Sequence, residues 1–79
     1  MPRFHFNVCN GIVALDEEGV LLPDLDAAKA SALAGVRALM SEAILAVRVL
    51  CLGDSIEITD AAGTLLHVTR FGDGVEIRP

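Results

Sequence analysis

LPDLDAAKASALAGVRALMSEAILAVR, residues 22–48, has the composition of one long α-helix. Alanine and leucine favour helix, and the segment contains no proline after its second residue. Asp24 suits the N-cap position because its short carboxylate accepts hydrogen bonds from the free amide groups of the first turn. Asp26 adds negative charge where the helix dipole favours it. We therefore expect a helix from about 24 to about 48 that ends before Gly53-Asp54.

The apolar residues of this helix form two rows. The first is a stripe rich in alanine, which indicates close packing against a sheet. It consists of Leu25, Ala28, Ala32, Val36, Leu39, Ala43, Ala46 and Val47. The second row, Leu33, Met40 and Ile44, runs along its flank, where one small sheet does not easily cover it. Either the segment after the helix folds over this row, or the row is a homodimer interface; we predict the homodimer.

The chain before the helix has the pattern of strands. Residues 3–9 alternate, with Phe4, Phe6 and Val8 on one face. Asn10-Gly11 is a strong hairpin pair, and residues 12–15 are the returning strand. Residues 16–19 are a turn that ends in glycine, and 20–22 form a further strand. We expect a three-stranded meander.

The chain after the helix predicts a second hairpin. Strands at 55–59 and 64–69 flank a turn at 60–63, and a further turn at 71–74 precedes a short strand or docked terminus at 75–77. The element order is therefore β-β-β-α-β-β. This order predicts an α+β fold in one domain, residues 1–79, with two layers: an antiparallel sheet and one long helix on one of its faces.

Composition and charge exclude several classes of function. The 79 residues carry a net charge of −5, which disfavours binding to nucleic acid and to anionic membranes, and three phenylalanines are the only aromatics. Charged residues interrupt every candidate membrane span, and we find no signal-peptide pattern. Cys9 and Cys51 match no zinc or redox motif, so we expect two thiols in a reducing cytoplasm. The hydrophobic content of 53% is high for so small a body.

Three segments carry a resemblance to a known family. They are Met1-Pro2-Arg3-Phe4-x-Phe6, the turn Asp16-Glu17-Glu18-Gly19 and the run from Leu22 to Ala30. Together they resemble a family of small uncharacterised bacterial proteins, a domain of unknown function, and this resemblance implies a shared fold without an activity. The strands that lead into an alanine-rich helix are also similar to the partner-binding domain of HicB-type antitoxins, which implies a small interaction domain.

Pro2 is the main enzymatic candidate. Removal of Met1 would leave a secondary amine at the start of a strand, as in tautomerase-type enzymes, where such an amine is the general base. Apolar neighbours such as Phe4 would lower its pKa, and an arginine would hold an acidic substrate. The glycine and arginine pattern of the tautomerases is missing after the first strand.

The two histidines are a weaker candidate for a metal site. If their strands were neighbours, His5, His67 and Cys9 would offer three ligands and an open position. Their sequence spacing does not enforce this, and two separate histidines on a polar sheet face are the simpler interpretation. The carboxylates at residues 16–18, 24 and 26 lack the ladder of a calcium loop, so we assign them to turns and capping.

The sequence therefore predicts a non-enzymatic, homodimeric protein-interaction module of the cytoplasm, without a cofactor, and with Leu33, Met40 and Ile44 in the interface. A protein partner that pairs with an exposed sheet edge is compatible with this hypothesis. The alternative is a tautomerase-like enzyme with Pro2 as its base.

Overall fold

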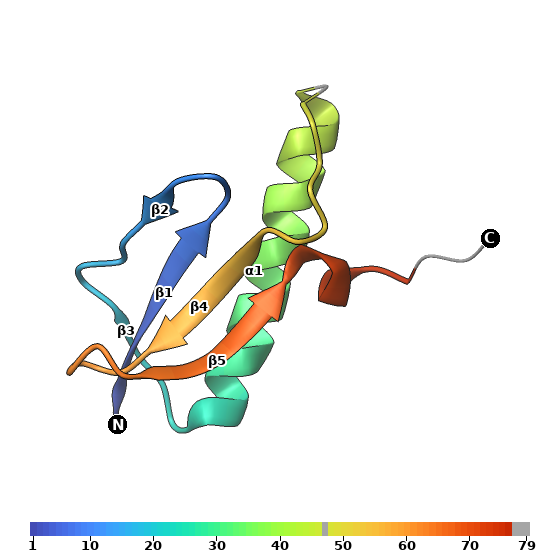
Figure 1. Ribbon diagram of the computed structural model, residues 1–79. Coiled ribbons are helices and arrows are strands. Elements are labelled where there is room, and N and C mark those ends of the chain that lie inside the picture. Colours follow the sequence, from blue (N-terminus) through green and yellow to red (C-terminus); the bar gives the residue numbers. More distant parts are fainter. Residues whose placement is uncertain (47, 77–79) are drawn as a thin grey trace.

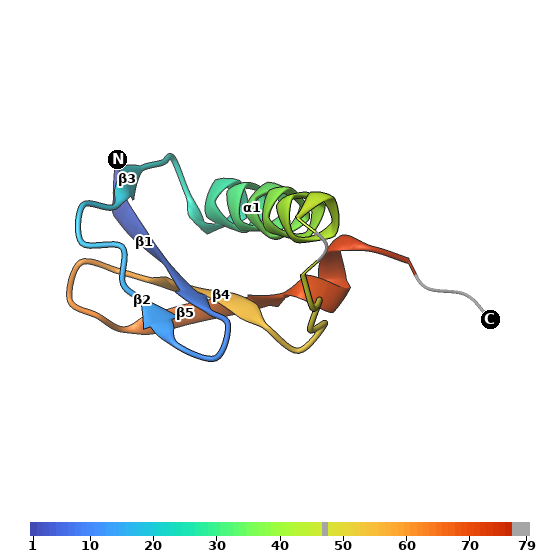
Figure 2. The ribbon, with the colours of Figure 1, turned by 90° about the horizontal axis from the view of Figure 1, so that it is seen from above.

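The computed structural model of the protein describes residues 1–46 and 48–76. Its elements are β1 (Arg3–Cys9), β2 (Val13–Ala14), β3 (Val20–Leu21), α1 (Leu25–Leu45), β4 (Ser55–Thr59), β5 (Leu65–Arg70) and the 3₁₀-helix η1 (Phe71–Gly74). The strands form one antiparallel sheet with α1 packed on one face, which confirms the predicted α+β fold. The helix and the sheet form two layers, and the second face of the sheet carries no helix (Figure 1, Figure 2).

The core lies between α1 and the central strands. Val36 and Ile58 are the largest side chains that are fully buried. The other buried apolar residues are Phe4, Ala28, Ala32, Met40, Ile56 and Phe71. The small side chains of Ala28 and Ala32 are completely covered, which places the helix backbone close to the sheet, as the alanine stripe predicted.

The N-terminal end of α1 confirms the predicted cap. The Asp24 carboxylate accepts a hydrogen bond from the Ala27 amide at 2.8 Å. The helix ends at Leu45, about one turn earlier than expected. Ala46, the residue after this end, donates its amide to the Glu42 carbonyl of the last turn. Val47 of the predicted stripe lies outside the described residues. At the other end of the chain, Val75 is in no strand, and Ile77 also lies outside the described residues.

The predicted three-stranded meander is wrong in its pairing. β3 pairs with β1, through Arg3 opposite Leu21 and Phe4 opposite Val20, instead of with β2. β2 pairs with the other end of β1. Between the two short strands, the Asp16 carboxylate accepts a hydrogen bond from the Phe6 amide at 3.1 Å. The Asp16 side chain thus takes the place of a strand carbonyl. The segment from β2 to β3 runs back along β1 in one direction, instead of forming a second hairpin between β2 and β3.

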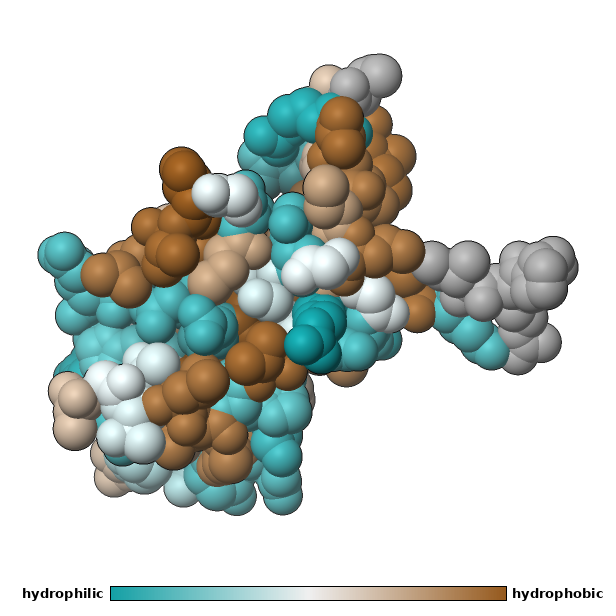
Figure 3. All heavy atoms as spheres, in the orientation of Figure 1, coloured by the Kyte–Doolittle hydropathy of each residue, from teal (hydrophilic) through white to brown (hydrophobic). Residues whose placement is uncertain are grey.

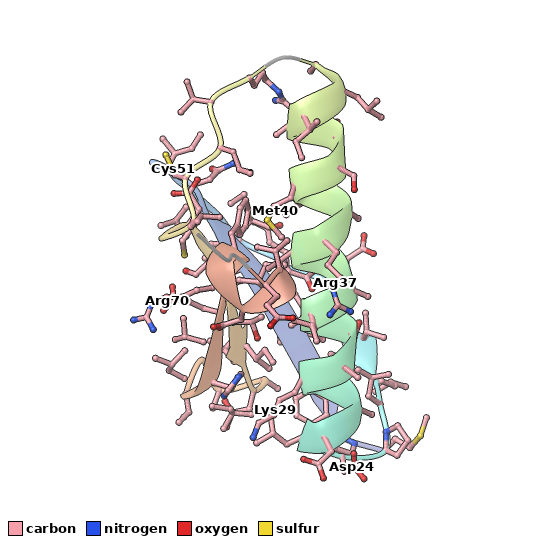
Figure 4. The ribbon with its side chains drawn as sticks, turned by 90° about the vertical axis from the view of Figure 1, so that its right-hand side faces the viewer. Asp24, Lys29, Arg37, Met40, Cys51 and Arg70 are labelled. Carbon is pink, nitrogen blue, oxygen red and sulfur yellow. The ribbon has the colours of Figure 1, made fainter. Side chains whose placement is uncertain are left out.

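The expected exposure of Met40 is also wrong. Only 3% of this residue is accessible to solvent, because η1 folds over it. A Cβ atom added to Gly74 of η1 would lie 2.9 Å from the Met40 Cε atom. Figure 4 shows Met40 pointing from α1 toward the rest of the chain. The segment after the helix therefore covers this part of the second row, which is the alternative that the sequence left open.

Gly19 and Gly63 provide a matched test of how tightly the loop after β2 is held against β1. Both have a positive φ, of 71° and 86°. A Cβ at Gly19 would lie 2.9 Å from the Phe4 carbonyl oxygen, whereas no atom lies within 4 Å of a Cβ at Gly63. We expect Gly63→Ala to lower the free energy of unfolding by about 1–2 kcal/mol through backbone strain alone. Gly19→Ala should cost about 2 kcal/mol more, because the loop must move away from β1.

Urea unfolding followed by circular dichroism measures both changes. Equal losses for the two variants would contradict close packing of the loop.

Candidate functional site

A polar network holds the loop after β2 on the open face of the sheet. Asn7 of β1 accepts a hydrogen bond from the Asp16 amide at 2.9 Å, and its own amide group lies 3.5 Å from the Thr59 hydroxyl of β4. The Asp16 carboxylate in turn accepts from the amides of Phe6 and Gly19, both at 3.1 Å. Asn7 is nearly buried although it lies on a face without a helix, because this loop covers it.

His5 joins the same network. Its Nδ1 atom donates to the Asp16 carbonyl oxygen at 2.6 Å, and since a carbonyl only accepts, Nδ1 carries the proton. In the neutral ring, Nε2 is then the free acceptor. Beside His5 lies an open cavity of about 300 Å³. It is lined by His5, Asn7, Leu15, Asp16, Glu17, Thr59, Asp60, Ala61 and Gly63.

Two of the carboxylates that line this cavity, Asp16 and Asp60, have structural partners. Asp60 accepts from the amides of Ala62 and Thr64, both at 2.9 Å, and so forms the predicted turn before β5. Burial alone would raise the pKa of Asp16, but the amide hydrogen bonds from Gly19 and Phe6 outweigh it. With the nearby charge of His5, they lower the pKa of Asp16 below its ordinary value of 3.8. These groups hold loops in place and are not arranged for acid–base chemistry.

The structure separates the residues of the predicted metal site. β4 lies between β1 and β5, so the strands of His5 and His67 are not neighbours. His67 stands opposite the buried Ile58 and therefore faces the helix, whereas His5 stands opposite Thr59. Within residues 1–46 and 48–76, no three His, Cys, Asp or Glu side chains are placed to hold a metal ion. The hypothesis that both histidines project from the solvent face is wrong.

The two thiols have different surroundings. Cys9 and Cys51 are both free; Cys9 is half-buried on β1, and Cys51 is exposed. The Cys9 Sγ atom donates to Glu57 Oε1 at 3.0 Å. This hydrogen bond, followed by burial and the negative charge of Glu57, raises the pKa of Cys9 above 9.0. Cys9 is therefore a poor nucleophile.

The tautomerase hypothesis, which nothing in the structure tests, concerns Pro2, directly before β1. Pro2 is exposed, its carbonyl accepts a hydrogen bond from the Leu22 amide at 3.1 Å, and it lines neither the cavity beside His5 nor the second one described below. The neighbouring Arg3 uses its guanidinium to donate to the Glu18 carbonyl at 2.7 Å.

The most exposed apolar side chains of the helical layer gather where α1 projects beyond the sheet. They are Ile44, Leu45, Val49 and Leu52, which we call the apolar end. Figure 3 shows apolar surface here and a separate apolar patch over β2. Of the predicted interface residues, Ile44 belongs to the apolar end, Leu33 is half-buried against the core, and Met40 is buried.

A second cavity, of about 280 Å³, lies beside the apolar end, with Leu39, Val49, Leu50 and Phe71 in its lining. The ion pair between Arg48 and Glu42, 3.9 Å apart, also lies here; both side chains are largely exposed, so it contributes little stability.

Sequence reasoning missed the Asn7–Asp16 contact and the exposure of Val49 and Leu52. The Asn7–Asp16 contact had one indication in the sequence: an Asn inside an alternating strand, followed nine residues later by an Asp-x-x-Gly turn. The exposure of Val49 and Leu52 depends on where the helix ends relative to the sheet, and hydropathy alone does not give this position.

The comparisons with known proteins agree with the resemblance inferred from the sequence. The family model of a domain of unknown function, DUF6894, matches residues 3–72. No curated protein and no solved structure matches the chain. Among the described residues, no helix has the length and apolar character that crossing a membrane requires.

Asp16→Asn tests the contribution of the polar network to stability. At neutral pH we expect this variant to lose about 1–2 kcal/mol of unfolding free energy, because charge-assisted hydrogen bonds to two amides become neutral ones. The pKa of Asp16 in the folded protein lies below its ordinary value of 3.8. The stabilisation by its carboxylate is therefore complete at pH values above 3.8, and it is lost as the pH falls through the lowered pKa. Wild type and variant should therefore converge in stability at strongly acidic pH.

Chemical unfolding across a pH series measures this difference. Glu17→Gln, in the same loop, is the control that removes one carboxylate charge without removing the hydrogen bonds of Asp16. A constant gap between wild type and Asp16→Asn at every pH would contradict the assignment.

Limited alkylation with iodoacetamide tests the thiol assignment. In the folded protein we expect Cys51 to react first, because it is exposed, and Cys9 to lag behind it. Glu57→Gln should speed up the reaction of Cys9 several-fold, because the pKa of the thiol falls when the carboxylate is removed. Mass spectrometry of peptides locates the label, with Cys51 as the internal reference. Equal rates at Cys9 in wild type and variant would contradict the role of Glu57.

Proposed function

Since the chain belongs to the DUF6894 family, whose function is unknown, we propose a function from its surface: a non-enzymatic protein-interaction module that forms a homodimer through the apolar end. One observation carries this proposal. Ile44 and Leu45, at the C-terminal end of α1, and Val49, in the segment after it, are 64%, 85% and 88% exposed. Three large aliphatic side chains exposed to water are costly, and a partner surface would cover them.

The surface area supports a second copy of the chain as this partner. The accessible surface is 5268 Å², whereas a compact monomer of 8.3 kDa exposes about 4,600 Å². The excess of about 700 Å² is close to the roughly 800 Å² that each partner buries in a standard interface. The radius of gyration, 12.8 Å, likewise exceeds the roughly 11.6 Å of a compact chain of this length.

The chemistry of the apolar end also suits a contact between identical surfaces. A two-fold interface brings each patch against its own copy, and aliphatic side chains are complementary to themselves in a way that a patch of one charge is not. Arg48 and Glu42 lie beside the patch and would form a polar rim of both signs. The two free thiols fit the reducing cytoplasm in which we place the protein.

The double substitution Ile44→Glu and Val49→Glu tests the homodimer. Each removes apolar burial and adds a charge at the interface, so we expect the dissociation constant to rise by more than about 100-fold. Sedimentation equilibrium and native mass spectrometry measure the oligomeric state. Ile12→Glu is the matched control, because Ile12 is 77% exposed but lies near β2, and it should leave the dimer intact. A wild-type protein that stays monomeric at millimolar concentration would overturn the proposal.

A further inference from the structure

Strand β5 is an edge of the sheet that no strand covers. It stands last in the order β2-β1-β4-β5, so one side of its backbone pairs with no other strand of the described chain. The strand has six residues, contains no proline and carries a single Lys or Arg, Arg70, at its end. Proteins usually blunt an edge of this length with proline, charge or a covering loop. β5 has no proline, and its one irregularity, the register shift opposite Ile58 and Thr59, lies near its start. The stretch from His67 to Arg70 pairs regularly with β4 and can therefore accept an additional strand on its other side.

The helix extends past this edge. Figure 1 shows the first half of α1 behind and beyond β5, and the two elements are in contact. Two observations identify the flank of α1 on this side: Arg37 Nε donates to the Gly74 carbonyl at 2.9 Å, and Met40 lies beneath η1, which directly follows β5. Lys29 and Leu33 lie on the same flank, two turns and one turn before Arg37. In Figure 4, Arg37 lies on the viewer's side of α1 beside η1, and Lys29 projects from the lower part of α1 toward the side of the sheet.

This region, which we call the basic edge, consists of β5 and the flank residues Lys29, Leu33 and Arg37. It contains three of the six Lys and Arg residues of a chain whose net charge is −5. No acidic residue occurs in β5 or in residues 27–41 of α1; Asp26 and Asp73 lie outside it at the two ends. Within residues 1–46 and 48–76, the side chains of Lys29 and Arg70 form no ion pair. The positive charges of Lys29 and Arg70 are thus available to a partner, whereas Arg37 also donates to the Gly74 carbonyl.

We infer that the basic edge binds an extended, acidic segment of another protein as an additional antiparallel or parallel strand. The backbone of β5 supplies the hydrogen bonds, Lys29 and Arg37 attract carboxylates on the helix-facing side of the added strand, and Leu33 contacts its apolar atoms. This inference rests on the proposed interaction function. It adds a second surface and the class of partner that this surface fits.

A second copy of the chain does not suit this site. If two β5 strands paired around a two-fold axis, both helices would lie on the same face of the joined sheet. Their flanks would then face each other and bring Lys29 and Arg37 of one copy toward the same residues of the other. Like charges repel when they are brought together, so the basic edge disfavours pairing with a second copy and favours an acidic strand.

Two capped nine-residue peptides test the inference. In the first, glutamate alternates with valine; in the second, glutamine replaces every glutamate, so that length and strand propensity are nearly unchanged. We expect the acidic peptide to bind at least about tenfold more tightly than its neutral analogue, with an affinity that falls as salt is added. In the complex, backbone amides of β5 should exchange with solvent more slowly, whereas those of β2 and β3 should not change. Amide NMR spectra report both quantities.

Charge reversals in the chain complete the experiment. Lys29→Glu and Arg70→Glu should each weaken binding of the acidic peptide about tenfold, and Arg48→Glu, the same change outside the basic edge, should not. The Ile44→Glu, Val49→Glu double variant should bind the peptide as the wild type does, so the homodimer and the basic edge are judged separately. Equal binding of the two peptides, protection at β2 and β3 instead of β5, or no binding at millimolar peptide would each overturn the inference.

Discussion

A helix longer than the sheet beneath it is the constraint on which the rest of the structure depends. The 21 residues of α1 span about 32 Å, whereas the five residues of β4, on which it packs, span about 17 Å. Val36 and the small Ala32 fix the middle of the helix against Ile56 and Ile58. Both ends must then project, one past the open edge of β5 and the other past the end of the sheet. The two surfaces to which we assign function are these two projections.

The two edges of the sheet differ, and in our proposal this difference directs a partner to one of them. Along β1, two strands of two residues each are separated by a loop that Asp16 and Asn7 hold in place. The Asp16 carboxylate takes up an amide that would otherwise be offered to another chain, so this edge is closed. In the part of the chain that the structure describes, no equivalent loop covers β5. Closing one edge with side chains while leaving the other unpaired is a simple way to restrict pairing to one side of a small domain.

Much of the fold could be predicted from the sequence, because it follows from local chemistry. The Asp24 cap and the Asp-x-x-Gly turns are set by interactions within a few residues, and both are present. The alanine stripe is present from Leu25 to Leu39, whereas Ala46 near its end is exposed. The pairing of β3 could not be predicted, because it depends on one carboxylate that replaces a backbone carbonyl across ten residues of sequence. The position of Met40 depends on η1, a turn more than thirty residues away, which no periodicity in the helix reveals.

The candidate site was less predictable because it depends on register. Hydropathy favours Leu66 and Val68 for the core side of β5, yet the irregularity between Ile58 and Thr59 shifts the pairing, so that His67 and Thr69 face the helix. A polar Thr69 is consequently buried, whereas Leu66 is 37% exposed. The same shift places β5 with its polar side under the cationic flank of α1. The register shift therefore places His67 on the helix side, against the prediction, and it also makes the open edge of β5 suited to a polar strand.

The two proposed surfaces are compatible in one assembly. The apolar end lies at the C-terminal end of α1, whereas Lys29 and Leu33 of the basic edge lie in its first half, so a dimer through the apolar ends leaves both β5 edges free. Such a dimer presents two strand-binding edges. A partner that carries two acidic segments would then bind the second one at a high effective concentration, and its overall affinity would exceed that of either edge alone. The affinity of one short edge for one added strand is weak. When the apolar ends hold two copies together, two such contacts are sufficient for a stable complex.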